Sequence, residues 1–499
     1  MRKFAAVLCA LLLCLAAAQA GADALVVTGY DSESVSRMWE NSLFFSRLQE
    51  MTGVETSAHA VTEAEEYQKL LADMEKGNVS ADVLFKANLT REQEQSLADS
   101  GALIDLAPMI AENMPNLNAL LEAHPEWKEI ITLPDGRIVS LPLINESERQ
   151  VLVWINAAWL GKLGLAMPED MEALTQALAA IRDGDPNGNG AADEIPANLT
   201  GTFEMRWLLP YFGIVADDYH LARNEAGEIV FAPELPGYRA FIAQLADWYA
   251  QGILTDAAFT NTHVAQQLAV TSDSSKKEVP VRSGLLVSLA PYTVESIESA
   301  QDYKALLMPG PDGVIRWRDF LGEVWPGCFA VTSACGNPQD ALKWVDALYS
   351  DEGAMLGYAG VEGEDFSYNA EGRWAFLVDD LRTVDSIRAG VIMYTGGTMP
   401  GITPDEFLYQ VDSAVDVHVL DACAGARAVA QRVTPPYCLN AQEQEQASAL
   451  AFAINPLVEA GIGRFATGET ELTDETYEAW LETLRAAGSD ALAALFADK

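Results

Sequence analysis

Strand-like and helical segments alternate along most of this chain. Leu25–Thr28 and Ala81–Phe85 are short apolar runs of the kind that forms buried strands. Residues 62–77 between them repeat apolar side chains every three to four positions, which predicts a helix, and Thr62 with Glu65 predicts a capping box at its start. Because parallel strands need crossover connections of this kind, the pattern predicts an α/β fold with largely parallel sheets.

The same alternation continues toward the C-terminus. A chain of 499 residues is long enough for two to four domains or two large lobes, and its 49% hydrophobic content is ample for packed cores. Further strands are predicted at 137–142, 150–154, 283–289 and 328–332. Further helices are predicted at 34–51, 171–181, 238–249 and 473–496.

The N-terminus has the pattern of a secretory signal. Arg2 and Lys3 precede an apolar run, and Ala18-Gln19-Ala20 supplies a small-x-small cleavage site, so residues 1–20 are predicted to be a signal peptide. The run is short for a membrane span, and no later segment has the ~20 apolar residues that a span needs. Large residues precede both cysteines of the run, which disfavours a lipid anchor. We therefore expect an exported protein, in the periplasm or at the outer face of the cytoplasmic membrane.

The charge balance narrows the classes of partner. The chain has 31 Lys and Arg against 73 Asp and Glu, a net charge of −42. Such a surface repels phosphate backbones and anionic lipids, so nucleic-acid binding is not expected. The five histidines are not paired at metal-ligand spacing, which weighs against histidine-based zinc sites and catalysis.

Four cysteines follow the signal segment. Cys328 and Cys335 are 7 residues apart, and Cys423 and Cys438 are 15 apart, so two local disulfides are the simplest pairing in an exported protein. Four free buried thiols are an alternative of similar weight.

Residues 183–194 match the calcium-loop pattern D-x-[DN]-x-[DN]-G-x5-E. Ca²⁺ takes six to eight oxygen ligands, which side chains at alternate loop positions provide, while a glycine allows the sharp turn. One register starts at Asp183. We favour a second register, which uses more of the oxygens present. Its ligands are Asp185, Asn187, Asn189, the Ala191 carbonyl, Asp193 and Glu194.

The calcium is expected to be structural, because the loop follows one long helix and has no second copy. The alternative is a surface turn that binds no metal.

Several segments together resemble one known family. The loop from Asp185 to Pro196, the Leu97–Leu106 segment, Trp154–Leu165 and Trp325–Ser333 are similar to family 1 extracellular solute-binding proteins, in particular the alginate-binding and lipoprotein-like subgroup. These proteins are the receptors of carbohydrate ABC importers. The resemblance extends over essentially the whole chain after the signal segment.

The resemblance implies a fold and a domain organisation. It predicts a two-lobed periplasmic-binding-protein-like α/β fold with a ligand cleft between the lobes, which close through a few hinge residues. Lobe 1 is predicted at 25–148 and 320–395, and lobe 2 at 149–319 and 396–499.

The resemblance also implies a function: a non-catalytic, monomeric receptor that delivers a saccharide, an oligosaccharide in particular, to an ABC permease. Aligned with maltose-type receptors, five residues fall at the cleft. They are Asn88, Asn145, Glu146, Trp207 and Tyr292. Each has a structural alternative: Trp207 as a core residue, Tyr292 as the end of its strand, Glu146 as a solvated hinge residue. Trp317 and Trp325 are weaker candidates.

Two other classes of function compete with a receptor. A secreted calcium-containing polysaccharide hydrolase or lyase needs paired carboxylates, which are plentiful here. The sequence lacks the G-x-S-x-G and H-E-x-x-H patterns of other hydrolases. A calcium-dependent adhesin is disfavoured because the chain has no internal repeats.

Overall fold

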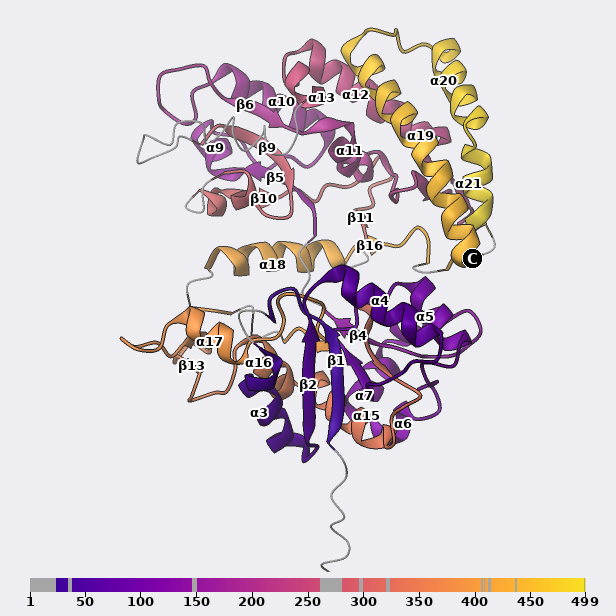
Figure 1. Cartoon of the computed structure of the whole chain (residues 1–499). Coiled ribbons are helices and arrows are strands. Elements are labelled where there is room, and N and C mark those ends of the chain that lie inside the picture. The colour runs from indigo at the N-terminus through magenta and orange to yellow at the C-terminus, as the bar shows by residue number, and fades with distance from the viewer. Residues whose placement is uncertain are drawn as a thin grey trace, which may run out of the picture. The chain divides into compact units, whose positions relative to one another are not determined.

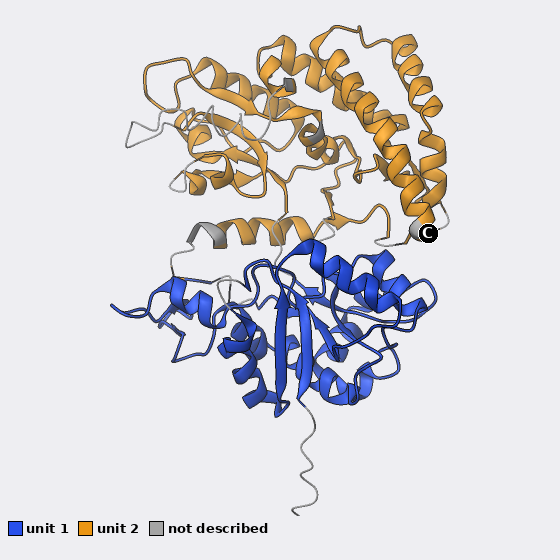
Figure 2. Cartoon of the chain, in the orientation of Figure 1, with its two compact units in different colours: residues 1–145, 324–410 blue, residues 146–323, 411–499 orange. Residues whose placement is uncertain are grey.

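The computed structural model of this protein describes most of the chain after residue 23. The described residues are 24–34, 38–145, 150–260, 281–295, 299–319, 324–404, 407, 409–411, 414–435, 438–497 and 499. The predicted signal segment 1–20 and the predicted ligand residue Glu146 lie outside these ranges. The chain forms two compact units, coloured separately in Figure 2: unit 1 is 1–145 with 324–410, and unit 2 is 146–323 with 411–499.

Unit 1 is built on a six-stranded mixed sheet with the order β15-β4-β12-β3-β1-β2. Figure 1 labels β1, β2 and β4 of this sheet. β1 is parallel to β2 and β3, β15 is parallel to β4, and β12 is antiparallel to both of its neighbours. The strands are β1 Leu25–Tyr30, β2 Thr56–Val61, β3 Val83–Phe85, β4 Leu141–Ile144, β12 Val324–Val331 and β15 Gly401–Ile402.

Helices pack on this sheet through apolar faces. In α3, the Ser42 hydroxyl caps the start, Gly53 ends the helix with a φ of 73°, and Phe44, Phe45 and Leu48 are buried. The helices of unit 1 are α3 Leu43–Thr52, α4 Ala64–Glu75, α5 Arg91–Asp99, α6 Ile110–Asn113, α7 Pro115–Ala123, α8 Pro125–Ile131, α15 Pro338–Asp346, α16 Asp351–Tyr358 and α17 Val384–Val391. A hairpin of β13 Phe366–Tyr368 and β14 Trp374–Phe376 completes the unit.

The strand order reverses at β1. The chain runs from β1 through α3 to β2 on one side of β1, and then returns through α4 to β3 on its other side. The carboxyl ends of β1 and β3 are therefore neighbours from which the chain departs in opposite directions. In open α/β sheets, this reversal leaves a crevice outside the strand ends, where ligands bind.

Unit 2 has a four-stranded sheet with the order β10-β5-β9-β6. β5 and β9 are buried along their whole length, as their continuous apolar runs predict. The strands are β5 Leu152–Asn156, β6 Ile195–Asn198, β9 Ser283–Ser288 and β10 Tyr303–Ala305, with two small pairs, β7 Leu221–Arg223 with β8 Ile229–Phe231 and β11 Trp317–Arg318 with β16 Ala430–Gln431.

The helices of unit 2 cover this sheet and extend to the C-terminus. They are α9 Ala157–Lys162, α10 Met171–Asp183, α11 Gly201–Met205, α12 Pro236–Ala250, α13 Asp256–Thr260, α18 Ala414–Arg427, α19 Ala441–Thr467, α20 Asp474–Ala486 and α21 Ser489–Phe496, with a 3-10 helix η2 at Arg206–Phe212. α12 packs on α19, and Tyr238, Phe241, Ile242, Leu245 and Trp248 on α12 are buried in the core of the unit.

The structure corrects several local predictions. α4 begins at Ala64 after Glu63 with no side-chain cap, so the capping box of Thr62 and Glu65 is wrong. Where one helix was predicted at 34–51, the described residues have a 3-10 helix η1 at Trp39–Asn41 and then α3 from Leu43, while 35–37 lie outside the described ranges. The strand predicted at 137–142 is displaced to β4, Leu141–Ile144, and β2 was not predicted.

The structure also differs from the predicted disulfides and the predicted domain boundaries. Cys328, Cys335, Cys423 and Cys438 form no disulfide, so the predicted pairing is wrong; the alternative of buried thiols holds for Cys328 and Cys423, whereas Cys335 and Cys438 are half-buried. The chain passes from one unit to the other after residues 145, 323 and 410. The predicted boundaries were after residues 148, 319 and 395. The last boundary moves because β15 pairs with β4 and so places the segment before it in unit 1.

Candidate functional site

The reversal point of unit 1 carries a buried ion pair. Asp31 directly follows β1 and Lys86 directly follows β3, and the Lys86 ammonium lies 3.0 Å from an Asp31 carboxylate oxygen, with both side chains 0% exposed. The same oxygen accepts a hydrogen bond from the Trp39 indole N–H at 2.8 Å, and the other accepts one from the Glu33 backbone N–H at 3.0 Å. The desolvated charges are thus paired and hydrogen-bonded, which a buried ion pair requires in order to be tolerated.

This ion pair holds a distant segment on the strand ends. The Lys86 ammonium donates to the Thr395 carbonyl at 2.6 Å, and the Ser32 backbone N–H donates to the Gly396 carbonyl at 2.9 Å. At Gly397, an added Cβ would lie 2.8 Å from the Tyr30 carbonyl oxygen, so only glycine fits this close approach. The segment 395–398 is therefore fixed over the carboxyl ends of β1 and β3.

Asn88 belongs to the same edge. Its side-chain oxygen accepts the Thr398 backbone N–H at 3.0 Å, and its amide nitrogen donates to the Lys86 carbonyl at 3.2 Å. An asparagine amide has two N–H donors and two acceptor lone pairs, so one of each is left beyond these two bonds. Lys86 and Asn88 both have left-handed backbones, with φ of 55° and 46°. Such conformations cluster at binding sites, where the surrounding structure enforces them.

The other predicted ligand residues lie at different places. Asn145 follows β4 at the end of the first segment of unit 1, and its side-chain oxygen is buried without a hydrogen-bond partner among the described residues. Tyr292 lies in a short 3-10 helix, Pro291–Thr293, just beyond the carboxyl end of β9, and is half-buried.

Trp207 is a core residue of unit 2. Its side chain is 7% exposed, its ring stacks on Trp317 with centroids 6.2 Å apart, and the Arg318 guanidinium carbon lies 5.3 Å from its ring centroid. This environment leaves little ring surface on which a sugar can stack. The structure therefore favours the core alternative for Trp207 over the ligand role that we predicted.

The predicted calcium loop connects α10 to β6 and turns on itself through its own polar groups. The two carboxylate oxygens of Asp185 accept the backbone N–H groups of Asn189 and Gly190, at 3.0 and 2.9 Å. The side-chain amides of Asn187 and Asn189 both reach one oxygen of Asp193, each at 3.0 Å. Four of the predicted ligand residues thus converge. Partial burial by itself would raise the pKa of Asp193, but the Asn187 and Asn189 amides and the Arg282 guanidinium together hold it below its usual value.

Asp183 belongs only to the first register of this loop, whereas Glu194 closes both registers. Asp183 points away and pairs with Arg182 at 2.7 Å, which holds its pKa below the usual value. Glu194 has both carboxylate oxygens buried, with no hydrogen-bond partner in the described part of the chain. A buried carboxylate without donors is costly unless a cation accompanies it, so this residue fits a metal ligand.

Acidic, histidine and cysteine side chains do not suffice for a metal site by themselves. Within the described ranges, no three of them lie together in a way that could hold a metal ion. A cation in the loop would therefore depend on the amide oxygens of Asn187 and Asn189 and on the Ala191 carbonyl as well as on carboxylates.

Sequence reasoning missed Asp31, Lys86 and Thr395. The available signal was that Lys86 directly follows the predicted strand 81–85 and Asp31 lies three residues after the predicted strand 25–28, where polar residues meet at the carboxyl edge of a parallel sheet. The contribution of Thr395 depends on a contact across 309 positions of sequence, which no local pattern reveals.

A family model described as bacterial extracellular solute-binding protein matches residues 44–363, and the chain belongs to this family. This confirms the predicted resemblance. Among the described residues, no helix combines the length and apolar character needed to cross a membrane.

Individual relatives are carbohydrate-binding proteins. The chain is 29% identical over 345 residues to the fructooligosaccharide ABC transporter substrate-binding protein FusA of Streptococcus pneumoniae, a match that covers 66% of this chain and 61% of the relative. The structure of FusA in complex with kestose superposes with a TM-score of 0.63 at 22% identity, over 95% of this chain and 97% of that one. A further FusA structure is of an EF-hand mutant in complex with fructo-nystose.

Two other solved structures extend the comparison. A solute-binding protein from Bifidobacterium longum infantis, associated with a transporter that binds human milk oligosaccharides (HMO), has a TM-score of 0.73 at 20% identity, over 95% of this chain and 98% of that one. The alginate-binding protein AlgQ2, in a form without calcium ion, has a TM-score of 0.59 at 17% identity, over 96% and 98% of the two chains. At these identities the structures establish the fold alone. They confirm the predicted two-lobed α/β class.

Proposed function

We propose that this protein is an extracellular receptor that binds an oligosaccharide and delivers it to an ABC permease without catalysing a reaction. The observation that carries the proposal is the carboxyl edge of β1 and β3, where a buried ion pair fixes Asn88 and the segment 395–398. Sugar hydroxyls are recognised by rigidly held amides, carboxylates and backbone groups of this kind. FusA and the Bifidobacterium protein, whose names specify oligosaccharides, support the class of ligand.

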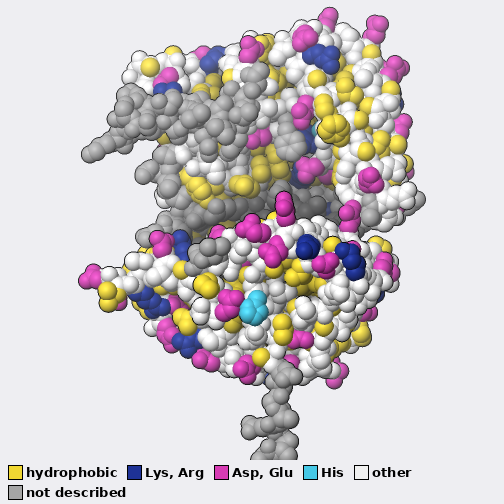
Figure 3. All heavy atoms as spheres, in the orientation of Figure 1, with side chains coloured by type: hydrophobic (Ala, Val, Ile, Leu, Met, Phe, Trp, Pro, Cys, Tyr) yellow, Lys and Arg dark blue, Asp and Glu magenta, His cyan; other side chains and the backbone are white. Residues whose placement is uncertain are grey.

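The surface charge favours an uncharged sugar. Acidic side chains are spread over the visible face of the chain, with fewer basic ones among them (Figure 3), and the formal net charge is −42. Such a field raises the energy of an approaching anion, so a neutral oligosaccharide is a better match than a polyuronate. Asn145, Glu146 and Tyr292 are part of this proposal as further ligand residues.

The experiment is a thermal-shift panel of kestose, nystose, human milk oligosaccharides and alginate oligosaccharides. A ligand at 100 times its dissociation constant stabilises a protein by about 2.7 kcal/mol. The panel is followed by product analysis after prolonged incubation. Binding without turnover supports the receptor, whereas new reducing ends or unsaturated products support the hydrolase or lyase. Absence of stabilisation by every sugar contradicts saccharide binding.

We also propose that the loop 185–194 binds one structural Ca²⁺. The buried carboxylate of Glu194 and the convergence of Asp185, Asn187 and Asn189 with Asp193 support this, together with the EF-hand that was mutated in one FusA structure. The bound ion would supply positive charge to the loop between α10 and β6. Calorimetric titration with Ca²⁺ tests the site. The absence of binding heat at millimolar Ca²⁺ would show that the loop is a turn that binds no metal.

Export completes the proposal. We propose that residues 1–20 direct secretion and are removed, and that the released chain acts as a monomer beside its permease. Mass spectrometry of the exported protein should give an N-terminus at Gly21, and light scattering should give the mass of one chain. A lipid attached to the N-terminal region would show instead that the receptor is anchored to the membrane.

A further inference from the structure

The loop 377–382, which connects β14 to α17 in unit 1, exposes three large apolar side chains. Leu381 is 94% exposed, Val378 is 54% exposed and Leu377 is 37% exposed. The hairpin before this loop and α17 after it lie at the outer margin of unit 1 (Figure 1). Single exposed apolar residues are normal on a protein surface, but three within five positions form a patch, and such patches mark interaction surfaces.

The loop is held in one conformation by hydrogen bonds at its base. One Asp379 carboxylate oxygen accepts the backbone N–H groups of Leu381 and Arg382, both at 2.7 Å, and these donors hold the pKa of Asp379 below its usual value. The Arg382 guanidinium donates to the buried Asp365 carboxylate, and the Leu377 N–H donates to the Asp365 carbonyl at 2.8 Å. The apolar side chains are therefore presented on a fixed backbone, which reduces the conformational entropy lost when a partner binds.

A groove lined largely by apolar side chains adjoins this loop. It lies between α3, α16 and β13 and has a volume of about 720 Å³. Met51 in its lining is 40% exposed. Arg382 also donates to the carbonyl of Glu364, a residue of the groove, so the loop and the groove form one continuous surface. The other apolar residues of the lining include Met355, Val361, Phe366 and Tyr368.

Acidic side chains surround the groove. Arg47 pairs with Glu50 at 3.0 Å and with Glu364 at 2.5 Å. The side chains of Asp351, Glu352 and Glu362 are exposed and have no hydrogen-bond or ion-pair partner among the described residues. The lining has five carboxylates and one guanidinium, a balance of −4, from Glu50, Asp351, Glu352, Glu362 and Glu364 against Arg47.

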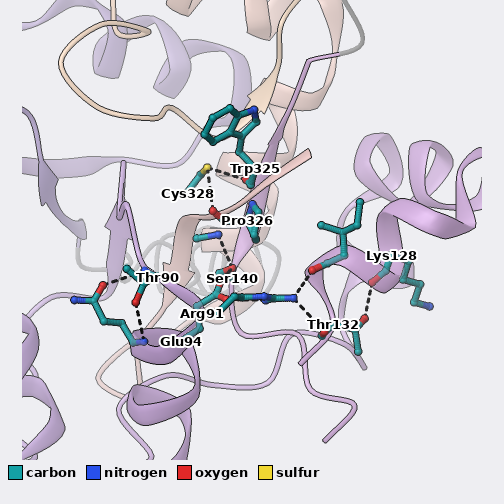
Figure 4. A network of polar contacts seen from close by, with 12 residues as sticks. Thr90, Arg91, Glu94, Lys128, Thr132, Ser140, Trp325, Pro326 and Cys328 are labelled. Carbon is teal, nitrogen blue, oxygen red and sulfur yellow. Dashed lines mark hydrogen bonds and ion pairs between the residues drawn. The ribbon is translucent and has the colours of Figure 1, made fainter. Parts of the chain in front are cut away.

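Carboxylates that serve the fold of unit 1 have a different environment. Glu94 is 0% exposed and accepts hydrogen bonds from Arg91 at 2.6 Å and from the Ser140 hydroxyl. Ser140 in turn accepts the Gly327 backbone N–H at 2.9 Å, so this Ser140–Glu94 network fixes the first part of β12 (Figure 4). The three exposed carboxylates of the groove lack such donors, and their field attracts a partner that carries positive charge.

This charge discriminates among the possible partners. An anionic lipid surface would be repelled, and a second copy of this chain would bring the same carboxylates against its own. A protein segment that combines apolar side chains with Lys or Arg matches both the exposed loop and the acidic groove. The function proposed above requires one protein partner, the ABC permease.

We propose that the loop 377–382 and the adjoining groove form a surface by which unit 1 docks on the permease, with Leu381 as its apolar anchor. The proposal rests on the receptor function proposed above. The surface is separate from the sugar site of unit 1. α3 leads from the carboxyl end of β1 to the start of the parallel strand β2, so Glu50 and Met51 near its end lie away from the carboxyl edge.

The first experiment separates docking from sugar binding. Leu381→Asp places a charge at the exposed anchor, and cells whose only copy of the receptor is this variant should take up labelled kestose on the order of tenfold more slowly. The affinity for kestose by calorimetry and the Tm should equal those of the wild type. If another sugar of the panel gives a larger thermal shift, that sugar is used. The control is Phe452→Asp on α19, where the ring is 86% exposed, and it should support wild-type uptake.

The outcomes separate this inference from the receptor function. Wild-type uptake by Leu381→Asp, together with normal sugar binding, overturns the docking surface and leaves the receptor intact. A lower sugar affinity or a lower Tm of this variant would assign Leu381 to the sugar site or to the fold, and also overturns the docking role. A wild-type protein that binds no sugar overturns both proposals.

Photo-cross-linking in intact cells identifies the partner. A benzophenone amino acid at position 381 should give a product that contains a membrane-spanning subunit of the permease, identified by mass spectrometry. The same amino acid at position 452 should give no such product. A product with a second copy of this chain, or the absence of any permease subunit, overturns the proposal.

Charge reversal tests the chemistry of the partner. Asp380 is exposed in the loop and has no hydrogen-bond partner in the described part of the chain, so its substitution should leave the turn intact. Asp380→Lys should lower uptake more than Asp380→Asn, because a lysine repels a basic partner whereas an asparagine only removes an attraction. Faster uptake with Asp380→Lys would show that the facing surface is acidic and would overturn the assignment.

Discussion

The ion pair between Asp31 and Lys86 offers the most direct test of how the site of unit 1 is built. Lys86→Met keeps much of the side-chain length but removes the ammonium that lies 3.0 Å from the Asp31 carboxylate and 2.6 Å from the Thr395 carbonyl. Both partners are 0% exposed, so the carboxylate stays in an apolar surrounding without its cation. Removing one member of a buried pair costs about 3–5 kcal/mol. The Trp39 and Glu33 donors to Asp31 remain and favour the lower half of that range.

Thermal unfolding measures this cost. For a unit of this size, 1 kcal/mol corresponds to about 2–4 °C, so a cost of about 3–4 kcal/mol in Lys86→Met should lower the Tm of unit 1 by roughly 6–16 °C. Lys343→Met, the same change at an exposed position of α15, is the control and should leave the Tm within a degree or two. Kestose binding measured well below the lowered Tm should also weaken, because the ammonium no longer holds the segment 395–398 on the strand ends.

The double variant Asp31→Asn with Lys86→Met tests whether the unpaired charge of Asp31 causes the loss of stability in Lys86→Met. It buries no ion, so it should be more stable than Lys86→Met alone, although the second change adds another mutation to the core. A double variant that is less stable than either single variant would refute the electrostatic argument. A Tm of Lys86→Met equal to that of the wild type would refute the burial of the pair itself.

Three further predictions follow from the rest of the chain. Glu194→Gln should abolish the rise in Tm that Ca²⁺ produces over a chelator, because the charge of the buried carboxylate is lost, whereas Asp183→Asn should keep that rise; loss of the rise in Asp183→Asn while Asp193→Asn keeps it would restore the first register. Gly397→Ala should weaken kestose binding, since its Cβ meets the Tyr30 carbonyl at 2.8 Å, while Gly336→Ala, with nothing within 4 Å, should bind normally. Trp207→Ala should destabilise unit 2 by about 3–5 kcal/mol in denaturant unfolding, because the ring is buried, and should leave the sugar affinity of the folded protein unchanged. Weakened sugar binding at unchanged stability would show instead that Trp207 is a ligand residue.

Three of the strands predicted from the sequence are buried along their whole length, whereas β1, whose residues alternate between buried and half-buried, was predicted from its short apolar run. β3, β5 and β9 are continuous apolar runs, and the structure has a strand at each of them. β2 was missed because Thr56-Ser-Ala-His-Ala-Val61 contains only one large apolar residue and is mostly half-exposed. β15 has two residues, too few for any periodicity, and this is why the last boundary between the units was misplaced.

The two candidate sites differ in how much of each the sequence predicts. The loop 185–194 is continuous in sequence, so its spacing alone selects the residues that converge in the structure. Trp207 shows the limit of the same reasoning, because residue type and family position do not reveal that Trp317 and Arg318 cover its ring. Burial depends on residues more than a hundred positions away, and no local pattern specifies them.

The edge of unit 1 is assembled entirely from such long-range contacts. Segments 31–33, 86–89, 325–328 and 395–398 are brought together because β1 and β3 end where β12 begins, and because the Asp31–Lys86 pair and Asn88 fasten the last segment to them. Their chemistry is divided: the ion pair and the Ser140–Glu94 network are buried and hold the backbone, while Asn88 is half-buried and Trp325 is half-exposed. Substitutions at the exposed positions can therefore change which sugar is bound at little cost in stability, whereas substitutions in the buried pair should affect folding and binding together. This division predicts that ligand preference within the family varies with the exposed residues of this edge, on a buried framework that stays the same.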